Sequence, residues 1–376
     1  MKTRRRLLVV ARWPLGGIRT YMRYVYPFLP DCYEITLVAA STHEDEALRR
    51  DAAEVGIKLQ ICDSSAMTRA VFRELKSGRH ELVQSHGFIS ALHVFAANLL
   101  VRVPHVLTVH GILEDKLLGG ILGRIKRAVI SMVIRNVEVL YAVSNDILLH
   151  LKEEVKDLEL SRSRKVVIYN GIDVDRFNGN VAGKGALRKS IGIGGNIFLF
   201  GFLGRFMQQK GFNYLIDAVE MLNSEGLTDF RVLAVGSGDY QQHYQDMVRE
   251  RGLEGFFNFM PFCSDVVEVY RELDAVVMPS IWEASGLLAM EALCMGIPLV
   301  SSNCIGLRET VQDTPALVFE NKDSRALALC LRHVISDSPK GEFEQFAPVA
   351  RERFDVRRTA QAVHEMFNTI GIGQHS

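Results

Sequence analysis

The stretch "DAVVMPSIWEASGLLAMEALCMGIPLVSS", Asp274 to Ser302, predicts one complete strand–helix–strand unit. Its first apolar run ends at Ser280 without polar alternation, which is typical of a strand buried on both faces of a parallel sheet. A loop then leads to a helix expected from Gly286 to Met295, with Ser285 as its N-cap and a glycine directly after it. The second strand follows at once. This stretch therefore favours an α/β fold built on a parallel sheet.

The same alternation of short apolar runs and longer helical stretches extends through the chain. The strands expected in the first half span residues 5–11, 33–40, 57–63, 81–87, 105–111, 137–144 and 165–171. Those expected in the second half span residues 196–204, 230–236, 257–262, 274–280, 297–302 and 315–320. Helical stretches such as 19–29 and 44–54 lie between them. The pattern predicts two successive doubly wound, Rossmann-like domains.

The length of 376 residues also favours two domains, because it exceeds the size at which one hydrophobic core keeps growing. We expect an N-terminal domain over residues 1–177 and a C-terminal domain over residues 196–354. The glycine-rich interval 178–195 is interpreted as the linker between them. The last helical stretch, about 355–376, is expected to pack back on the first domain. Two such domains leave a cleft between the carboxyl ends of their strands, where ligands bind.

The composition excludes several classes of protein. With 48% hydrophobic and 23% charged residues the chain is globular, and no apolar run is long enough to span a membrane. The six cysteines form no CxxC pair, so we expect neither a zinc site nor a secreted disulfide framework, and predict a cytoplasmic protein. The net charge is zero, yet residues 1–180 contain 26 Lys and Arg against 20 Asp and Glu. This excess indicates an anionic partner for the first half.

Three loops that follow strands are candidate phosphate-binding sites. Gly16 and Gly17 follow the first strand, and backbone N–H groups at such a turn can face a phosphate. Arg205 and Lys210 follow the first strand of the second domain, where a guanidinium and an ammonium on one loop can grip a diphosphate. Gly236 makes a similar turn after the next strand. The alternatives are plain tight turns and two solvated loop cations.

Two glutamates and two histidines are further candidates. Glu283 is expected on the loop and Glu291 inside the helix of the opening stretch, so the two do not share a face. An unpaired carboxylate in so apolar a run is costly, which indicates that each meets hydroxyls or cations. The helix N-terminus between them offers free N–H groups to a phosphate. His86 and His110 each end a strand before a glycine, and such a histidine is either structural or part of a site.

Together, "GRFMQQKG" at 204–211 and "EASGLLAME" at 283–291 resemble blocks of the retaining glycosyltransferases of the GT-B fold, in particular glycosyltransferase family 4. The marker of that family is the Glu-x7-Glu pattern, which Glu283 and Glu291 match. Further blocks, in the order of the family, are "GGIRTY", "LTVHGI", "YAVS", "VIYNGIDVDRF", "VLAVGSGD" and "ETVQD". The resemblance covers nearly the whole chain. It implies a GT-B fold, in which two Rossmann-like domains face each other across a cleft.

The resemblance implies that a nucleotide-diphosphate sugar is the donor. Arg205 and Lys210 would neutralise its diphosphate as the leaving group. Gly16 and Gly17 would approach the same phosphates from the first domain, and Gly236 would line the donor site.

The resemblance also implies contacts to the rest of the donor. Glu291 would accept hydrogen bonds from the ribose hydroxyls, and Glu283 would face the hexose or the reacting centre. His110 would contact the sugar, and Asn170 would lie near the cleft. The backbone N–H groups that would contact sugar or phosphate are those of Gly286, Leu287 and Leu288.

The implied reaction moves a hexose or N-acetylhexosamine to a glycan or lipid-linked acceptor, with retention, in cell-envelope or exopolysaccharide assembly. No cofactor and no nucleic-acid partner is implied. No Asp-x-Asp motif lies in a suitable loop, so no metal ion is expected. Many relatives have Gly-Phe-Gly after the first glutamate, where this chain has Ala284-Ser285-Gly286. This departure alters the wall that faces the sugar and leaves the identity of the donor open.

The segment 115–136 combines a helical stripe of apolar residues with five basic ones. One interpretation, which we favour for the helix itself, is packing on its own sheet with a solvated basic face. The alternative is peripheral contact with an anionic membrane, at the inner face of the cytoplasmic membrane.

Two other functions compete with the transferase. A sugar-nucleotide epimerase of the same fold would have a different set of acids and histidines. A non-catalytic partner subunit of GT-B fold would be expected to lose Arg205, Lys210 or Glu291, and all three are present. A dehydrogenase is disfavoured because the dinucleotide fingerprint is missing.

Overall fold

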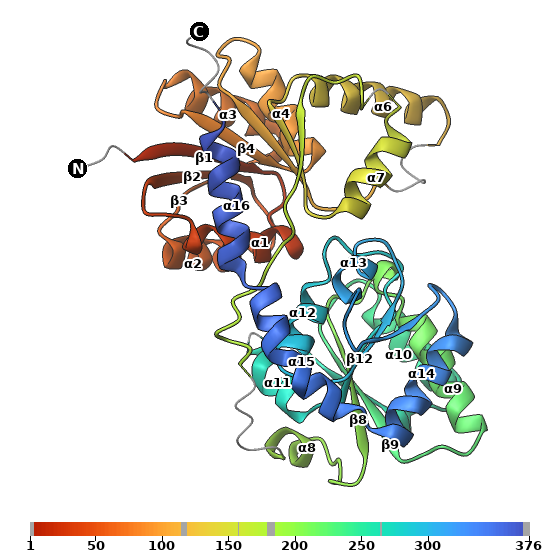
Figure 1. Ribbon diagram of the computed structural model, residues 1–376. Coiled ribbons are helices and arrows are strands. Elements are labelled where there is room, and N and C mark those ends of the chain that lie inside the picture. Colours follow the sequence, from red (N-terminus) through yellow and green to blue (C-terminus); the bar gives the residue numbers. More distant parts are fainter. Residues whose placement is uncertain (1–3, 114–118, 157, 179–184, 264, 371–376) are drawn as a thin grey trace. The chain divides into compact units, whose positions relative to one another are not determined.

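The computed structural model describes residues 4–113, 119–156, 158–178, 185–263 and 265–370. The chain divides into two compact units. The first unit comprises residues 1–171 and 356–376, and the second comprises residues 172–355. Each unit is an α/β structure with its own parallel sheet (Figure 1). The α/β class predicted from the strand pattern is confirmed.

The sheet of the first unit has seven parallel strands in the order β3-β2-β1-β4-β5-β6-β7. The strands are β1 (Arg5–Ala11), β2 (Tyr33–Ala40), β3 (Lys58–Cys62), β4 (Leu82–His86), β5 (His105–Val109), β6 (Val139–Ala142) and β7 (Arg164–Val167). Each corresponds to a strand predicted from the sequence, with ends that differ by a few residues. The order reverses direction between β1 and β4, which is the topology of a doubly wound sheet.

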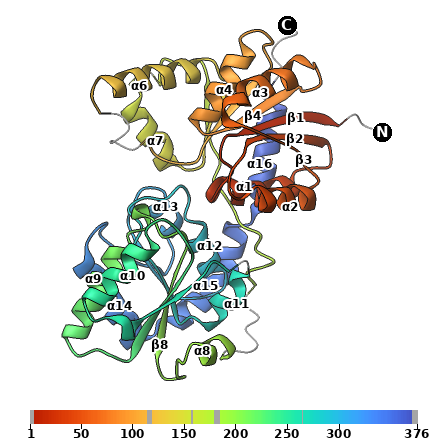
Figure 2. The ribbon, with the colours of Figure 1, turned by 180° about the vertical axis from the view of Figure 1, so that it is seen from behind.

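Helices cover both faces of this sheet, and its central strands are accordingly buried on both sides. On one face, α3 (Met67–Lys76) and α4 (Phe88–Asn98) pack against each other and against β1, β2 and β4. Figures 1 and 2 show α1 (Gly17–Val25) and α2 (Asp45–Val55) on the other side of the sheet. The 3-10 turn η1 (Tyr26–Phe28) follows α1.

The C-terminal helix α16 (Val356–Asn368) belongs to the first unit and lies against α1 and η1 (Figure 1). Arg5 of β1 donates a hydrogen bond to the carbonyl oxygen of Phe367 at 2.6 Å. The hydroxyl of Tyr33 lies 2.9 Å from Nδ1 of His364. The buried residues of α16 lie on one helical stripe, namely Val356, Thr359, Ala360, Val363, Met366 and Phe367. The end of the chain is thus part of the core that its beginning forms.

Helix α6 (Gly120–Arg135) is buried at few positions, one of which, Gly123, lies in its N-terminal half. Val133 and Ile134 are buried, whereas Ile121 is 77% exposed and Ile125 is 55% exposed. The favoured interpretation, a helix packed along its own sheet, therefore holds mainly for the second half of the helix. The helix contacts α4. Part of the predicted segment, residues 114–118, lies outside the described residues. Helix α7 (Asn145–Glu154) follows β6.

The sheet of the second unit has six parallel strands in the order β10-β9-β8-β11-β12-β13. The strands are β8 (Phe198–Leu203), β9 (Phe230–Val235), β10 (Phe257–Met260), β11 (Ala275–Met278), β12 (Leu299–Ser302) and β13 (Leu317–Phe319). All six were predicted from the sequence. The order again reverses, here between β8 and β11, so this sheet is also doubly wound.

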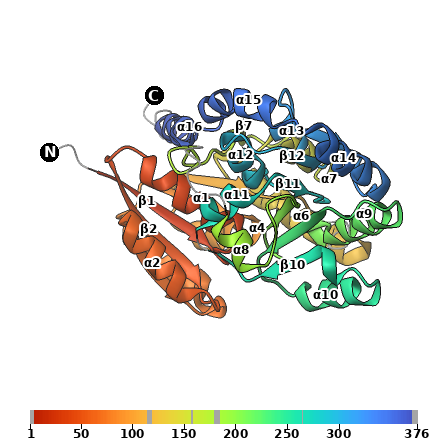
Figure 3. The same cartoon turned by 90° about the horizontal axis from the view of Figure 1, so that it is seen from below.

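Two groups of helices cover this second sheet (Figure 2). On one side lie α9 (Phe212–Ser224), α10 (Gln241–Glu250) and α14 (Ser324–Asp337), and Figure 3 shows α10 towards β10 and α14 towards β12. Their contact with the sheet is rich in aromatic rings, such as Phe202 and Phe212, whose centroids lie 4.6 Å apart. The helices of the second group are α11 (Val266–Glu272), α12 (Leu287–Cys294) and α15 (Lys340–Arg353). The short helix α13 (Arg308–Val311) precedes β13.

The predicted linker, residues 178–195, differs from the structure in its second half. It contains a short helix, α8 (Ala186–Ser190), which is part of the second unit and contacts α11. Residues 179–184 lie outside the described residues. Local composition could not predict this helix, because its attachment depends on partners about 85 residues away in the sequence.

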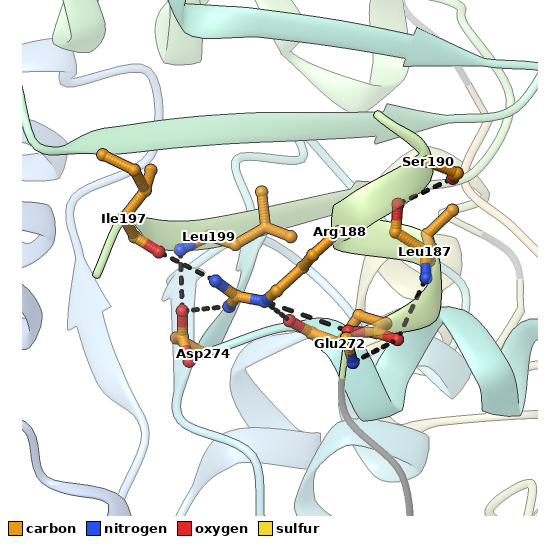
Figure 4. A network of polar contacts seen from close by, with 8 residues as sticks. Leu187, Arg188, Ser190, Ile197, Leu199, Glu272 and Asp274 are labelled. Atoms are coloured by element: carbon orange, nitrogen blue, oxygen red, sulfur yellow. Dashed lines mark hydrogen bonds and ion pairs between the residues drawn. The ribbon is translucent and has the colours of Figure 1, made fainter. Parts of the chain in front are cut away.

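A buried arginine attaches α8 to the second unit (Figure 4). The guanidinium of Arg188 donates to the carbonyl oxygen of Glu272 at 2.9 Å and to that of Ile197 at 2.8 Å, and it pairs with Asp274. The carboxylate of Glu272 accepts a hydrogen bond from the N–H of Gly185 at 2.8 Å. Both Arg188 and Glu272 are buried, so each charge depends on the other partners for its solvation.

Replacement of Arg188 by Met should destabilise the second unit. The carboxylates of Glu272 and Asp274 would lose their cation, and removal of one partner from a buried pair costs about 3–5 kcal/mol. The free energy of unfolding, measured by denaturant titration, is expected to fall by this amount. Lys189→Met is the matched control, because Lys189 is the exposed neighbour on the same helix. Equal stability of the two variants would contradict the role given to Arg188.

Candidate functional site

Predicted site residues of the second unit follow the carboxyl ends of its central strands. Arg205 follows β8, Gly236 follows β9 and Glu283 follows β11. Since the carboxyl ends of parallel strands meet at one edge of a sheet, these loops lie together at that edge. The structure thus brings together residues that are up to 78 positions apart in the sequence. Their functional roles remain predictions.

An ion pair at this edge joins two of the predicted residues. Nζ of Lys210, in the turn η3 (Gln208–Lys210), lies 2.6 Å from Oε1 of Glu283. Ser280 donates a hydrogen bond to the same oxygen, also at 2.6 Å. Glu283 is buried, and the pair explains how so apolar a loop accommodates a carboxylate. Each residue had a separate predicted role, and no pattern in the sequence indicates that they pair.

Arg205 is held much less firmly than Lys210. Its Nη2 lies 3.8 Å from Oδ2 of Asp239, and the two side chains are 44% and 87% exposed. An ion pair so open to water contributes little to stability. The guanidinium can therefore turn towards an incoming anion at small cost.

The helix that begins between the two glutamates starts without a side-chain cap. Helix α12 begins at Leu287, its N-cap residue is Gly286, and no side chain caps it. The predicted N-cap, Ser285, is therefore wrong. The reason is the left-handed backbone of Gly286 (φ 58°), which lies between Ser285 and the helix. Within the described part of the chain, the N–H groups of Leu287 and Leu288 have no acceptor, so both can serve a ligand.

Glu291 lies on the buried side of α12. The hydroxyl of Tyr270, on α11, donates to its Oε2 at 2.9 Å. This bond orients the carboxylate. Tyr270 was not predicted as a site residue, because it lies on a different helix and in no motif.

Two glycines allow the site loops to approach each other closely. A Cβ at Gly236 would lie 1.9 Å from the carbonyl oxygen of Gly204, on the loop after β8. A Cβ at Gly306, which the sequence analysis did not single out, would lie 2.1 Å from the carbonyl oxygen of Glu283. Gly236 thus has a packing role whatever its role towards a ligand.

In the first unit, the predicted glycines form an open turn. Gly16 adopts a left-handed φ of 52°, and α1 begins at Gly17. A Cβ added at either position would have no neighbour within 4 Å. The backbone there is accessible to a ligand. Asn170 follows β7 at the same edge of the sheet and is buried.

His110 follows β5 and lies against a second histidine. Its Nε2 is 2.7 Å from Nδ1 of His86, which ends β4. Burial lowers the pKa of His110 to about 3. Burial, and then the neighbouring His110, hold the pKa of His86 well below its usual value. Both imidazoles are therefore neutral at pH 7, and His110 is able to act as a neutral hydrogen-bonding group.

No three His, Cys, Asp or Glu side chains gather as a metal site within the described residues. Among the same residues, no helix has the length and apolar composition to cross a lipid bilayer.

The architecture is that of the GT-B glycosyltransferases. HepE of Anabaena, solved in complex with UDP and glucose, superimposes with a TM-score of 0.83 at 20% identity, over 97% of this chain and 100% of the other. WaaG, a glycosyltransferase involved in lipopolysaccharide biosynthesis, superimposes with a TM-score of 0.70 at 15% identity, over 96% and 99% of the two chains. The GT-B fold predicted from the motifs is confirmed.

The sequence matches the same class along both halves. Residues 15–176 match the family described as Glycosyltransferase Family 4, and residues 184–353 match the family described as Glycosyl transferases group 1. Both matches are to families of glycosyltransferases, and the chain belongs to this class, as its motifs predicted.

Two curated relatives cover most of the chain. An α-1,3-galactosyltransferase of Escherichia coli, named for UDP-Gal and for α-D-GlcNAc-diphosphoundecaprenol, is 27% identical over 311 residues, which is 78% of this chain and 77% of the relative. An uncharacterized glycosyltransferase of Methanocaldococcus jannaschii is 26% identical over 303 residues, or 75% and 76% of the two chains.

Proposed function

We propose that this glycosyltransferase moves a hexose or N-acetylhexosamine from a nucleotide-diphosphate sugar to a glycan or lipid-linked acceptor, with retention at the anomeric carbon. The observation that carries the proposal is the edge of the second sheet. There, Arg205, Lys210 and the uncapped N-terminus of α12 lie beside the two glutamates of the Glu-x7-Glu pattern. Such a set of donors and acceptors suits a ligand that has both phosphates and hydroxyls.

Departure of the nucleotide diphosphate is the step that these cations would assist. Negative charge develops on the phosphate oxygens as the bond to the anomeric carbon breaks. Arg205, Lys210 and the N–H groups of Leu287 and Leu288 would stabilise that charge, and such preorganised electrostatic stabilisation is often the largest catalytic effect. Lys210 is already held by Glu283, so its ammonium needs little reorganisation when the donor binds.

The carboxylates would select the donor by its hydroxyls. We assign Glu291, which Tyr270 orients, to the ribose, and Glu283 to the hexose or the reacting centre. From the first unit, Gly16 and Gly17 would approach the phosphates and His110 would contact the sugar, with Asn170 and Gly236 lining the site. Accessible backbone at the glycine turn and a neutral imidazole at His110 support these roles.

The relatives support a UDP-sugar donor and a lipid-linked acceptor. The name of the E. coli relative contains both UDP-Gal and a diphosphoundecaprenol-linked sugar. HepE is described in complex with UDP and glucose. We therefore place the reaction in cell-envelope or exopolysaccharide assembly, in the cytoplasm, without a cofactor.

A screen of nucleotide sugars tests the proposed donor class. A donor that binds only the folded protein raises its melting temperature by mass action. We expect stabilisation by at least one of the UDP- or GDP-sugars, measured by thermal shift, and transfer from that sugar in the presence of EDTA. If none of the sugars stabilises the protein, the proposed donor class is contradicted. Loss of turnover on addition of EDTA alone would contradict the metal-free mechanism.

Replacement of Arg205 by Ala should raise the activation free energy of transfer by about 2–4 kcal/mol, because removal of one oxyanion-stabilising donor has a cost of this order. Lys210→Ala should do the same, but it also leaves buried Glu283 without its cation. Arg205 is the cleaner test because its side chain is 44% exposed. Arg249→Ala is the control, because Arg249 is an exposed arginine paired with Asp246 on α10 of the same unit. Full activity of Arg205→Ala would exclude its role at the leaving group.

We also propose that the N-terminal half of α6 contacts an anionic membrane surface. Its exposed apolar residues are Ile121, Leu122 and Ile125. The helix has the basic residues Arg124, Lys126, Arg127 and Arg135 and no acidic residue. Apolar side chains among cations are complementary to anionic lipid headgroups over an acyl layer. Such a contact would bring a lipid-linked acceptor to the enzyme.

Vesicle binding tests this contact. Ile121→Ser with Ile125→Ser should weaken sedimentation with vesicles that contain an anionic phospholipid, because the apolar part of the contact is lost. Binding of the unchanged protein should fall as salt rises, since screening weakens the attraction of the cations. Leu329→Ser is the control, because Leu329 is an exposed leucine of the second unit. Undiminished binding of the double variant would exclude α6 as the membrane contact.

A further inference from the structure

A line of five polar side chains, four of them buried, ends at His110 in the first unit. Nε2 of Gln84 donates to Oγ1 of Thr108 at 2.8 Å. The hydroxyl of Tyr26 lies 3.1 Å from Oε1 of Gln84 and 2.7 Å from Nε2 of His86. Nδ1 of His86 lies 2.7 Å from Nε2 of His110. Each link is within hydrogen-bond distance, so the protons of the line are coupled.

Strand alternation brings these side chains to one side of the sheet. Gln84 and His86 are two positions apart on β4, and therefore point to the same face. Thr108 on β5 and His110 just after it are likewise two positions apart. His86 pairs in register with Thr108. Tyr26, from η1, bridges Gln84 and His86. The line thus depends on the pairing of two strands and one turn.

Neutral imidazoles allow the line only two proton arrangements. Burial lowers the pKa of His110 to about 3 and, with the neighbouring His110, holds that of His86 well below its usual value. A neutral imidazole has one N–H and one acceptor nitrogen. The two rings are therefore either both protonated on Nε2 or both protonated on Nδ1.

The amide of Gln84 decides between the two arrangements. Its nitrogen donates to Thr108, so its carbonyl oxygen faces Tyr26. A carbonyl oxygen only accepts, and Tyr26 must donate its single O–H proton to it. The oxygen of Tyr26 then accepts from Nε2–H of His86, and Nδ1 of His86 accepts from Nε2–H of His110.

We propose that Gln84, acting through Tyr26 and His86, is a positioning residue that holds His110 in the Nε2–H tautomer, so that His110 presents Nδ1 as an acceptor to a sugar hydroxyl. This inference rests on the proposed function for its ligand. His110 is partly exposed, and within the described residues its Nδ1 has no hydrogen-bond partner. A hydroxyl can donate to this nitrogen. An ionised phosphate or carboxylate oxygen cannot, so the tautomer makes the contact selective for a group that donates a proton, such as a sugar hydroxyl.

The tautomer can be measured directly by NMR. In protein labelled with 15N-histidine, long-range proton–nitrogen correlations separate a protonated ring nitrogen from an unprotonated one. The signals are assigned with His86→Gln and His110→Gln. We expect both rings to be protonated at Nε2 and not at Nδ1 at pH 7. Protonation of His110 at Nδ1 would overturn the proposal, because it would mean that the line runs in the opposite direction.

Breaking the line tests whether Gln84 sets its direction. In Gln84→Leu, the two tautomers of His110 should exchange, and its two ring nitrogens should move towards an averaged shift. Tyr26→Phe breaks the same line and serves if the first variant does not fold. Ser85→Ala is the control, because Ser85 bonds His105 between the same two strands at 2.8 Å and on the other face. An unchanged His110 tautomer in both line variants would exclude the positioning role.

Addition of the nucleotide sugar found by the thermal-shift screen tests the contact itself. We expect the Nδ1 signal of His110 to shift in the direction of hydrogen bonding, while the Nε2 signal stays in place. A sugar that binds without moving Nδ1 would contradict the acceptor role. If no sugar binds, the proposed function fails, whereas the tautomer of the free protein still decides whether Gln84 controls His110.

Discussion

Burial of parallel strands on both faces is the constraint on which each unit depends. Strands β1, β4 and β5 are buried on both sides, so helices cover both faces of the first sheet, and the second sheet follows the same rule. Because the strands of each sheet are parallel, their carboxyl ends all lie at one edge. Arg205, Gly236 and Glu283 lie together for this reason, although long helices separate them in the sequence. The site is a consequence of the sheet.

Charges inside this apolar frame persist only as compensated groups. Lys210 pairs with Glu283 at the carboxyl edge of the second sheet, and Arg188 holds Glu272 at the opposite end of the same sheet. In the first unit, His86 and His110 lose their charge instead, because burial depresses their pKa values. The low dielectric that makes these groups costly also strengthens their hydrogen bonds to a ligand. The same burial therefore shapes the fold and the chemistry proposed for it.

All thirteen strands in the described part of the chain could be predicted from the sequence, because an apolar run bounded by glycine or polar residues is a local signal. The candidate site could be predicted as a set of residues, through motifs that the family shares. The start of α12 could not, because the left-handed Gly286 separates Ser285 from the helix. Helix α8 could not be predicted, because two partners of Arg188, Glu272 and Asp274, lie more than 80 residues away in the sequence. Tyr270 and Gln84 could not be predicted as site residues either, because neither lies in a motif.

By itself, the sequence determined the α/β class, the two doubly wound sheets and the identity of the charged residues at their edges, since apolar period and motif spacing are properties of neighbouring residues. Only the tertiary structure decided which of those residues are partners. It pairs Lys210 with Glu283, Tyr270 with Glu291 and His86 with His110, and it leaves half of α6 exposed. The physical reason is that strand register and helix packing set distances between residues that are remote in the chain, and hydrogen bonds and ion pairs depend on those distances.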